Sequence, residues 1–117
     1  MKIKLACFLL LLLPFSLNAG GFLSSNTDLA KECVLLSKKV NQLSEQQSDT
    51  KCIVHLQYAS SSLDMSADNL FKEQIDEAKN NLKSALSYLF YTETYECAQL
   101  EQIHMAGEEV RNIQSKL

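Results

Sequence analysis

A seven-residue repeat of apolar side chains runs through the second half of the chain and constrains its fold more than any other feature. Two columns of the repeat are Ile75, Leu82, Leu89, Glu96, Ile103, Val110 and Leu117, and Phe71, Ala78, Ala85, Thr92, Gln99, Ala106 and Ile113. The repeat is interrupted only around residues 92–99, and residues 66–117 contain no Pro and a single Gly. Such a stripe forms one face of a helix, and this face must be buried against other helices.

Two shorter stripes precede the repeat. The first consists of Leu29, Cys33, Leu36, Val40 and Leu43, with Ser25 or Thr27 as the N-cap. The second spans about residues 51–63, with Asp49 or Thr50 as the N-cap, and consists of Cys52, Leu56, Ala59 and Leu63. Apolar and polar residues also alternate there, which is typical of a strand. Helices fit the whole chain better, and we expect an all-α fold, a small three- or four-helix bundle.

Residues 66–117 allow three arrangements. We expect Ser66 to cap a third helix, but aromatic residues and threonines at positions 88–96 favour strand as much as helix. The segment could be one long helix, a helical hairpin bent near residues 92–94, or a helix followed by a strand that pairs with residues 52–58. We favour the hairpin, because average helices are far shorter than 50 residues, although the bend lacks Gly, Pro, Asn and Asp.

Residues 1–21 have the pattern of a cleaved secretory signal peptide. Lys2 and Lys4 precede an apolar run at residues 5–13, and Pro14 and small residues follow it. The run is too short to span a bilayer, which takes about 20 apolar residues. We therefore expect residues 22–117 to form a single helical domain in the periplasm or outside the cell, without a stable membrane span.

Export places the remaining cysteines, Cys33, Cys52 and Cys97, in an oxidising compartment. Three cysteines allow one intramolecular disulfide and leave one thiol. Pairing of Cys33 with Cys52 closes the shortest loop and is the arrangement we favour. Pairing of Cys52 with Cys97, pairing of Cys33 with Cys97, and the absence of any bridge stay open.

Charge and motif content argue against several function classes. Without Lys2 and Lys4, 9 Lys and Arg residues stand against 14 Asp and Glu residues, a net charge of −5. Binding to nucleic acid requires clustered Lys and Arg residues, so we expect no binding to nucleic acid. The histidines and serines lack the partners that would activate a nucleophile, and no glycine-rich loop could hold a phosphate. We expect no enzymatic activity and no cofactor.

Metal binding is a weaker alternative. Glu101 and His104 have the spacing of a di-iron ligand pair, but a di-iron site needs a second such pair. Cys52, His55, Cys97 and His104 have the chemistry of zinc ligands without a defining spacing. We therefore expect no metal site, and a metal or redox carrier stays an alternative function.

Binding to a protein partner is the function we favour. Tyr88, Tyr91 and Tyr95 recur at helical spacing, and tyrosine is enriched at interface hot spots. Residues 84–110 contain five glutamates and no Lys or Arg, which would suit a basic partner. A second copy of the chain, forming a homodimer, is another candidate for the partner.

Residues 29–58 also resemble a known family. Cys33, and Cys52 followed six residues later by Tyr58, resemble the pattern of small periplasmic helical immunity proteins that neutralise secreted cell-wall toxins. The resemblance implies a periplasmic inhibitor of a secreted toxin. A secreted effector is a further alternative.

Overall fold

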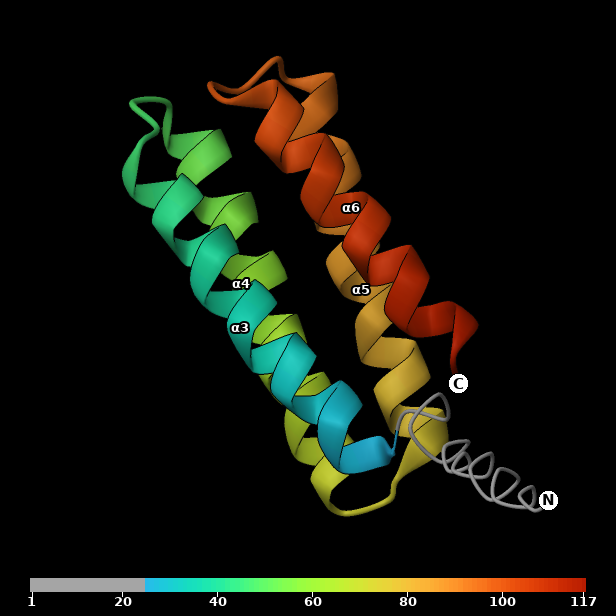
Figure 1. The fold of residues 1–117 in the computed structure, drawn as a ribbon. Coiled ribbons are helices and arrows are strands. Elements are labelled where there is room, and N and C mark those ends of the chain that lie inside the picture. The colour runs from blue at the N-terminus through green and yellow to red at the C-terminus, as the bar shows by residue number, and fades with distance from the viewer. Residues whose placement is uncertain (1–24) are drawn as a thin grey trace, which may run out of the picture.

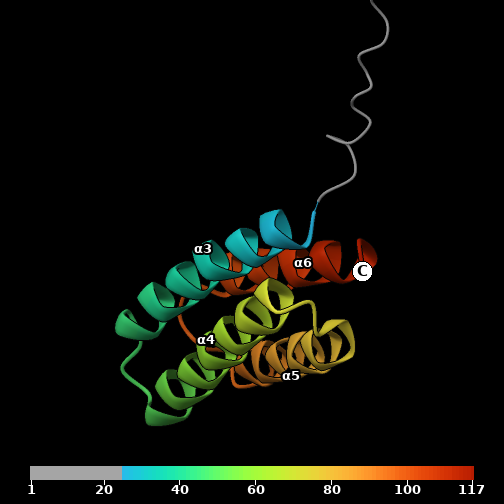
Figure 2. The ribbon, with the colours of Figure 1, turned by 90° about the horizontal axis from the view of Figure 1, so that it is seen from below.

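The computed structural model describes residues 25–117, and these fold into four helices joined by short turns (Figure 1). The helices are α3 (Asn26–Glu45), α4 (Thr50–Phe71), α5 (Ile75–Thr94) and α6 (Leu100–Ser115). Each helix packs against the next, and α6 also packs against α3, so that the four form a closed ring (Figure 2). This confirms the predicted all-α bundle. The predicted signal peptide, residues 1–21, lies outside the described residues.

The predicted apolar stripes form the core. All five stripe residues of α3 and all four of α4 are buried. Most of the seven-residue repeat is divided between α5 and α6, where its members inside the helices are buried. Phe71 departs from the prediction, because it is the last residue of α4 and is 51% exposed. Glu96 and Gln99 are exposed in the turn between α5 and α6. The largest fully buried side chains are Leu29, Leu36, Leu56, Leu63, Leu70, Leu82, Leu89, Ile103, Ile113, Val40, Val110 and Thr92. Burial of these stripes, at about 25 cal/mol per Å² of apolar surface, is the main stabilising contribution.

A pair of buried serines joins α3 to α4. The Ser37 hydroxyl donates to the Ser60 carbonyl, and the Ser60 hydroxyl donates to the Ser37 carbonyl, each at 3.0 Å. The two hydroxyl oxygens lie 2.8 Å apart. The exchange satisfies both polar groups within the helix interface, as burial requires. Small side chains at this position therefore allow the two helices to approach closely.

The predicted N-cap at Ser66 is wrong, because α4 continues to Phe71. Ser66 is fully buried in α4, where its hydroxyl donates to the Ser62 carbonyl at 3.0 Å and lies 3.4 Å from the Ala78 carbonyl of α5. The sequence predicted that the second helix ends near residue 63 and that a third begins at Ser66. In the structure, Ser60, Ser62 and Ser66 are buried in α4.

The bend predicted near residues 92–94 is present, since α5 ends at Thr94 and α6 begins at Leu100. Neither the single long helix nor the strand occurs in residues 25–117. A second turn, at residues 72–74, was not predicted. It separates α4 from α5 and returns the chain along the bundle.

Both turns stop the preceding helix in the same way, with a glutamate in the left-handed backbone region. Glu96 has φ 55°, its N–H donates to the Glu93 carbonyl at 3.1 Å, and the Cys97 N–H donates to the Thr92 carbonyl at 3.2 Å. Glu73, with φ 60°, repeats this pattern after α4. These are the two bonds of a Schellman motif, whose left-handed position usually holds Gly. The absence of Gly, Pro, Asn and Asp therefore does not prevent a turn at these two positions.

Replacing either glutamate by glycine should stabilise the protein. A side chain in the left-handed region costs roughly 1–2 kcal/mol, and the extra freedom of Gly in the unfolded chain offsets part of the gain. We expect Glu73→Gly and Glu96→Gly each to raise the free energy of unfolding by about 0.5–1 kcal/mol in urea titrations. Lys79→Gly, at an exposed position inside α5, is the control and should lower it by about 1 kcal/mol. Destabilisation by both glutamate substitutions would contradict this assignment of the turns.

Candidate partner-binding surface

All four tyrosines of the chain gather with a histidine on the surface formed by α4 and α5. We call this cluster the aromatic face, and its members are His55, Tyr58, Tyr88, Tyr91 and Tyr95. His55 and Tyr58 of α4 are three apart. Tyr88 and Tyr91 of α5 and its C-cap residue Tyr95 are three and four apart, so each set lies on one side of its helix. Packing of α4 against α5 places the two sets side by side.

His55 lies at the centre of the aromatic face. Its ring centroid is 5.4 Å from that of Tyr95, 5.7 Å from that of Tyr91, and 6.2 Å from those of Tyr58 and Tyr88. The angles between its ring plane and theirs are 62–71°, which is the favoured edge-to-face geometry. The His55 ring thus contacts all four tyrosine rings.

A backbone hydrogen bond fixes the orientation of the histidine. The Nδ1 atom of His55 lies 2.8 Å from the Lys51 carbonyl, one turn earlier in α4. A carbonyl only accepts, so Nδ1 carries a proton and donates. The Nε2 atom is left for interactions within the ring cluster or with a ligand.

The aromatic face is accessible to a partner. The exposed fractions of Tyr58, Tyr91 and Tyr95 are 51%, 48% and 41%. Phe90, with an exposed fraction of 64% and its ring centroid 6.5 Å from that of Tyr91, extends the aromatic surface. Half-exposed tyrosine rings that support one another offer large contact area at low entropic cost, as interface hot spots do.

A disulfide joins Cys52 of α4 to Cys97 of the turn between α5 and α6, at one end of the aromatic face. The Cα atoms of the two residues lie 5.7 Å apart. The Gln47 side-chain amide pairs with both backbone groups of Ala98, donating to its carbonyl at 2.9 Å and accepting from its N–H at 2.8 Å. The turn between α5 and α6 is therefore tied to α4 by the disulfide and to the turn between α3 and α4 by two hydrogen bonds.

The favoured pairing of Cys33 with Cys52 is wrong, and helix geometry explains why. Cys33 lies twelve residues before the end of α3, whereas Cys52 lies two residues after the start of α4. With a rise of about 1.5 Å per residue, these positions are about 15 Å apart along the hairpin, too far for a disulfide. The shortest loop in sequence is thus not the shortest distance in the fold.

Cys33 remains as a buried free thiol in α3. Burial raises the pKa of Cys33 to about 12, and the neighbouring carboxylate of Glu32 adds to the increase. The group is therefore a neutral thiol at physiological pH, and it packs as a small apolar side chain.

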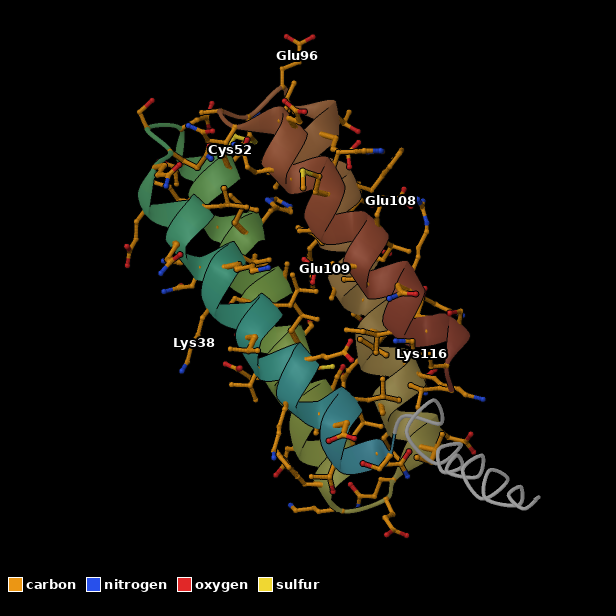
Figure 3. The ribbon with its side chains drawn as sticks, viewed as in Figure 1. Lys38, Cys52, Glu96, Glu108, Glu109 and Lys116 are labelled. Carbon is orange, nitrogen blue, oxygen red and sulfur yellow. A yellow bond between two sulfur atoms is a disulfide. The ribbon has the colours of Figure 1, made fainter. Side chains whose placement is uncertain are left out.

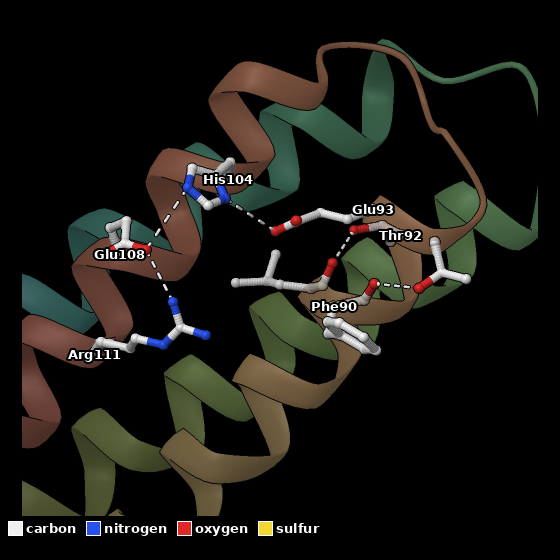
Figure 4. Close-up of polar contacts among 8 residues, drawn as sticks. Phe90, Thr92, Glu93, His104, Glu108 and Arg111 are labelled. Carbon is white, nitrogen blue, oxygen red and sulfur yellow. Dashed lines mark hydrogen bonds and ion pairs between the residues drawn. The ribbon is translucent and has the colours of Figure 1, made fainter.

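The second histidine belongs to a separate polar cluster between α5 and α6 (Figure 4). The Nδ1 atom of His104 lies 3.6 Å from a Glu93 carboxylate oxygen, and its Nε2 atom lies 3.7 Å from one of Glu108. Arg111 donates to the same Glu108 oxygen at 2.9 Å. These groups are largely exposed, so solvent weakens the Glu108–Arg111 ion pair and the contacts of His104 with the two carboxylates.

The residues considered as metal ligands do not come together. The sulfurs of Cys52 and Cys97 are joined in the disulfide, and His55 and His104 belong to different clusters. Glu101 is exposed and makes none of the ion pairs of the His104 cluster. Among residues 25–117, no group of three or more His, Cys, Asp or Glu side chains could hold a metal ion.

Only part of the aromatic face is predictable from the amino-acid sequence. The spacing of Tyr88, Tyr91 and Tyr95 identified the α5 side, and the structure brings these three residues together as expected. His55 and Tyr58 were missed as members of the surface. Their own three-residue spacing was the available signal, but it has meaning only when α4 is known to pack antiparallel to α5.

Loss of the disulfide should destabilise the protein strongly. The bridge closes a loop of 45 residues, for which chain entropy predicts a contribution of about 4 kcal/mol. We expect the variant with Cys52→Ser and Cys97→Ser to lose about 2–4 kcal/mol of unfolding free energy in urea titrations. A reductant should lower the melting temperature of the wild type and leave that of the double variant unchanged. Equal effects on both proteins would contradict the pairing.

Cys33 should resist thiol reagents in the folded protein. The thiolate is the reactive form, and the pKa of about 12 keeps Cys33 protonated. We expect no labelling by 5,5′-dithiobis(2-nitrobenzoate) at pH 7 or pH 9, since both values lie below the raised pKa. In 6–8 M urea, about one equivalent should react, because unfolding exposes the thiol and lowers its pKa. Labelling of the native protein at the rate of the denatured one would show that Cys33 is accessible.

Comparison of the chain with protein-family models, curated proteins and solved structures found no match. The resemblance of residues 29–58 to small periplasmic immunity proteins therefore stays a prediction. The functional interpretation depends on the geometry of the aromatic face.

Proposed function

We propose that this protein is a non-enzymatic binding protein that docks a protein partner on its aromatic face. The observation that supports this most directly is the placement of all four tyrosines around His55, three of them 41–51% exposed. The hydroxyl groups and ring faces of tyrosine allow hydrogen bonds and apolar contacts in one interface. A partner that covers these rings would remove apolar area from water without first having to order them.

The rigid support of the face also favours a binding role. The rings stand on α4 and α5, whose mutual packing is more extensive than either contact of α6. The Cys52–Cys97 disulfide limits movement of the two helices at one end. Sites on packed helices are held more precisely than sites on loops, and little is lost to ordering when they bind.

The disulfide also indicates an oxidising compartment for the folded chain. No helix within residues 25–117 has the length and hydropathy to cross a membrane. With the signal peptide predicted for residues 1–21, we place the mature protein in the periplasm or outside the cell. This location would bring the aromatic face to exported partners.

Neutralisation of a secreted toxin is the more specific form of this proposal. The resemblance to periplasmic immunity proteins includes Cys52 and Tyr58, and both lie at or beside the aromatic face. A toxin domain would be a partner of the kind that such a surface could cover. Nothing in the arrangement of the described residues favours a metal carrier or a secreted effector over this function.

Removal of two tyrosines from the centre of the face should abolish partner capture. We expect the variant with Tyr91→Ala and Tyr95→Ala to lose about a hundredfold or more in affinity, since hot-spot tyrosines contribute about 2 kcal/mol or more each and 1.4 kcal/mol is a tenfold change. The measurement is affinity capture from an envelope extract and from culture medium, with the captured protein identified by mass spectrometry. Retained helicity in circular dichroism would show that the bundle is intact.

The matched control removes two exposed apolar side chains outside the aromatic face. Leu35 of α3 and Met105 of α6 have exposed fractions of 61% and 59%. The variant with Leu35→Ala and Met105→Ala should capture the same partner as the wild type. Equal capture by the tyrosine variant, or equal loss in both variants, would exclude the aromatic face as the docking surface.

A further inference from the structure

The aromatic face already holds a cation in the free protein. The ammonium nitrogen of Lys51 lies 5.4 Å from the centroid of the Tyr95 ring. A cation within about 6 Å of a ring centroid is attracted by the negative face of the ring. Lys51 thus shows that a ring of the cluster is presented in a way that a long cationic side chain can reach.

The charges around this position favour a cation. Lys51 is the one Lys or Arg in residues 40–71, and residues 84–110 hold none. Asp49 caps α4 beside Lys51, and the exposed Glu96 follows Tyr95 and extends from the same end of the bundle as Cys52 (Figure 3). With a net charge of −5 for residues 22–117, the field at this end attracts positive groups.

The flat tyrosine rings suit a guanidinium group better than an ammonium group. Tyr91 and Tyr95 are nearly parallel, with 19° between their planes and 6.5 Å between their centroids. A guanidinium is planar and weakly hydrated, and it stacks on aromatic faces while it donates hydrogen bonds at its edges. The tyrosine hydroxyls could accept these bonds. An ammonium offers no comparable flat surface.

We infer that the aromatic face recognises an arginine side chain presented by its protein partner, and that Lys51 occupies part of that place in the free protein. The inference rests on the proposed function, because it names the chemistry of the partner that the same face would bind. It also gives Lys51 a role as an internal competitor. A partner arginine that reaches the Tyr95 ring would displace the lysine.

A minimal probe tests this chemistry without the partner. We would titrate the isotope-labelled protein with N-acetyl-arginine amide and, separately, with N-acetyl-citrulline amide, which has nearly the same shape and no charge. Backbone amide shifts observed by nuclear magnetic resonance should move around Tyr91 and Tyr95 for arginine and not for citrulline. Equal shifts with both probes, or none with arginine, would overturn the inference.

Variants of Lys51 and Tyr95 make the test specific. We expect Lys51→Ala to tighten arginine binding by about two- to fivefold, the strength of an exposed cation–π contact. Lys72→Ala, at the far end of the same helix, is the control and should leave binding unchanged. Tyr95→Phe should keep most of the binding, because the ring remains, and Tyr95→Leu should lose it. Unchanged binding in both Lys51→Ala and Tyr95→Leu would place the arginine elsewhere.

The two proposals can fail separately. Loss of capture in the tyrosine variant without arginine binding would leave the docking function standing and remove the arginine. Arginine binding without capture of any partner would show that the rings recognise a guanidinium and would remove the docking function. Co-sedimentation with phosphatidylcholine vesicles that depends on Tyr95 would assign the rings to a lipid headgroup and overturn the inference.

Discussion

The antiparallel packing of α4 against α5 is the constraint on which the rest of this structure depends. Each helix buries its apolar stripe against its neighbours, and α4 and α5 have one of the two most extensive contacts in the bundle. The same packing fixes which surface residues become neighbours. His55 and Tyr58 meet the tyrosines of α5 only because the two helices run side by side in opposite directions. The core therefore determines the composition of the aromatic face.

The disulfide end of the bundle reinforces this arrangement. Cys52 is one turn from His55, and Cys97 is two residues from Tyr95, so the bridge ties the helices next to the rings. The pairing of Gln47 with Ala98 links the two turns there as well. At the other end, the turn after α4 is held by backbone hydrogen bonds and by the Asn69 side chain, which bonds to Gln74 and Asn81. The covalent bond, however, lies at the end that carries the rings.

Periodicity predicted the fold class and the core, because burial of apolar stripes is a property of spacing alone. It could not predict helix boundaries that depend on tertiary contacts. Ser66 has the local signature of an N-cap but is buried inside α4, and Glu73 and Glu96 end helices without a turn residue. Periodicity also could not predict the disulfide pairing or the α4 half of the aromatic face, because both depend on how two helices lie relative to each other.

The groove between α3 and α6 is the main alternative to the aromatic face as the proposed docking surface. It has a volume of about 340 Å³ and an apolar floor that includes Leu36 and Leu43. Its rim, however, is lined by glutamines, Gln42, Gln46, Gln99 and Gln102, and the Lys39–Glu109 ion pair joins its two helices. Ordering such long side chains costs roughly 1.5–2 kcal/mol each, whereas rings that brace one another are ordered before a partner arrives. The groove is more concave, but the side chains of the aromatic face are better ordered before binding, and this order favours the aromatic face.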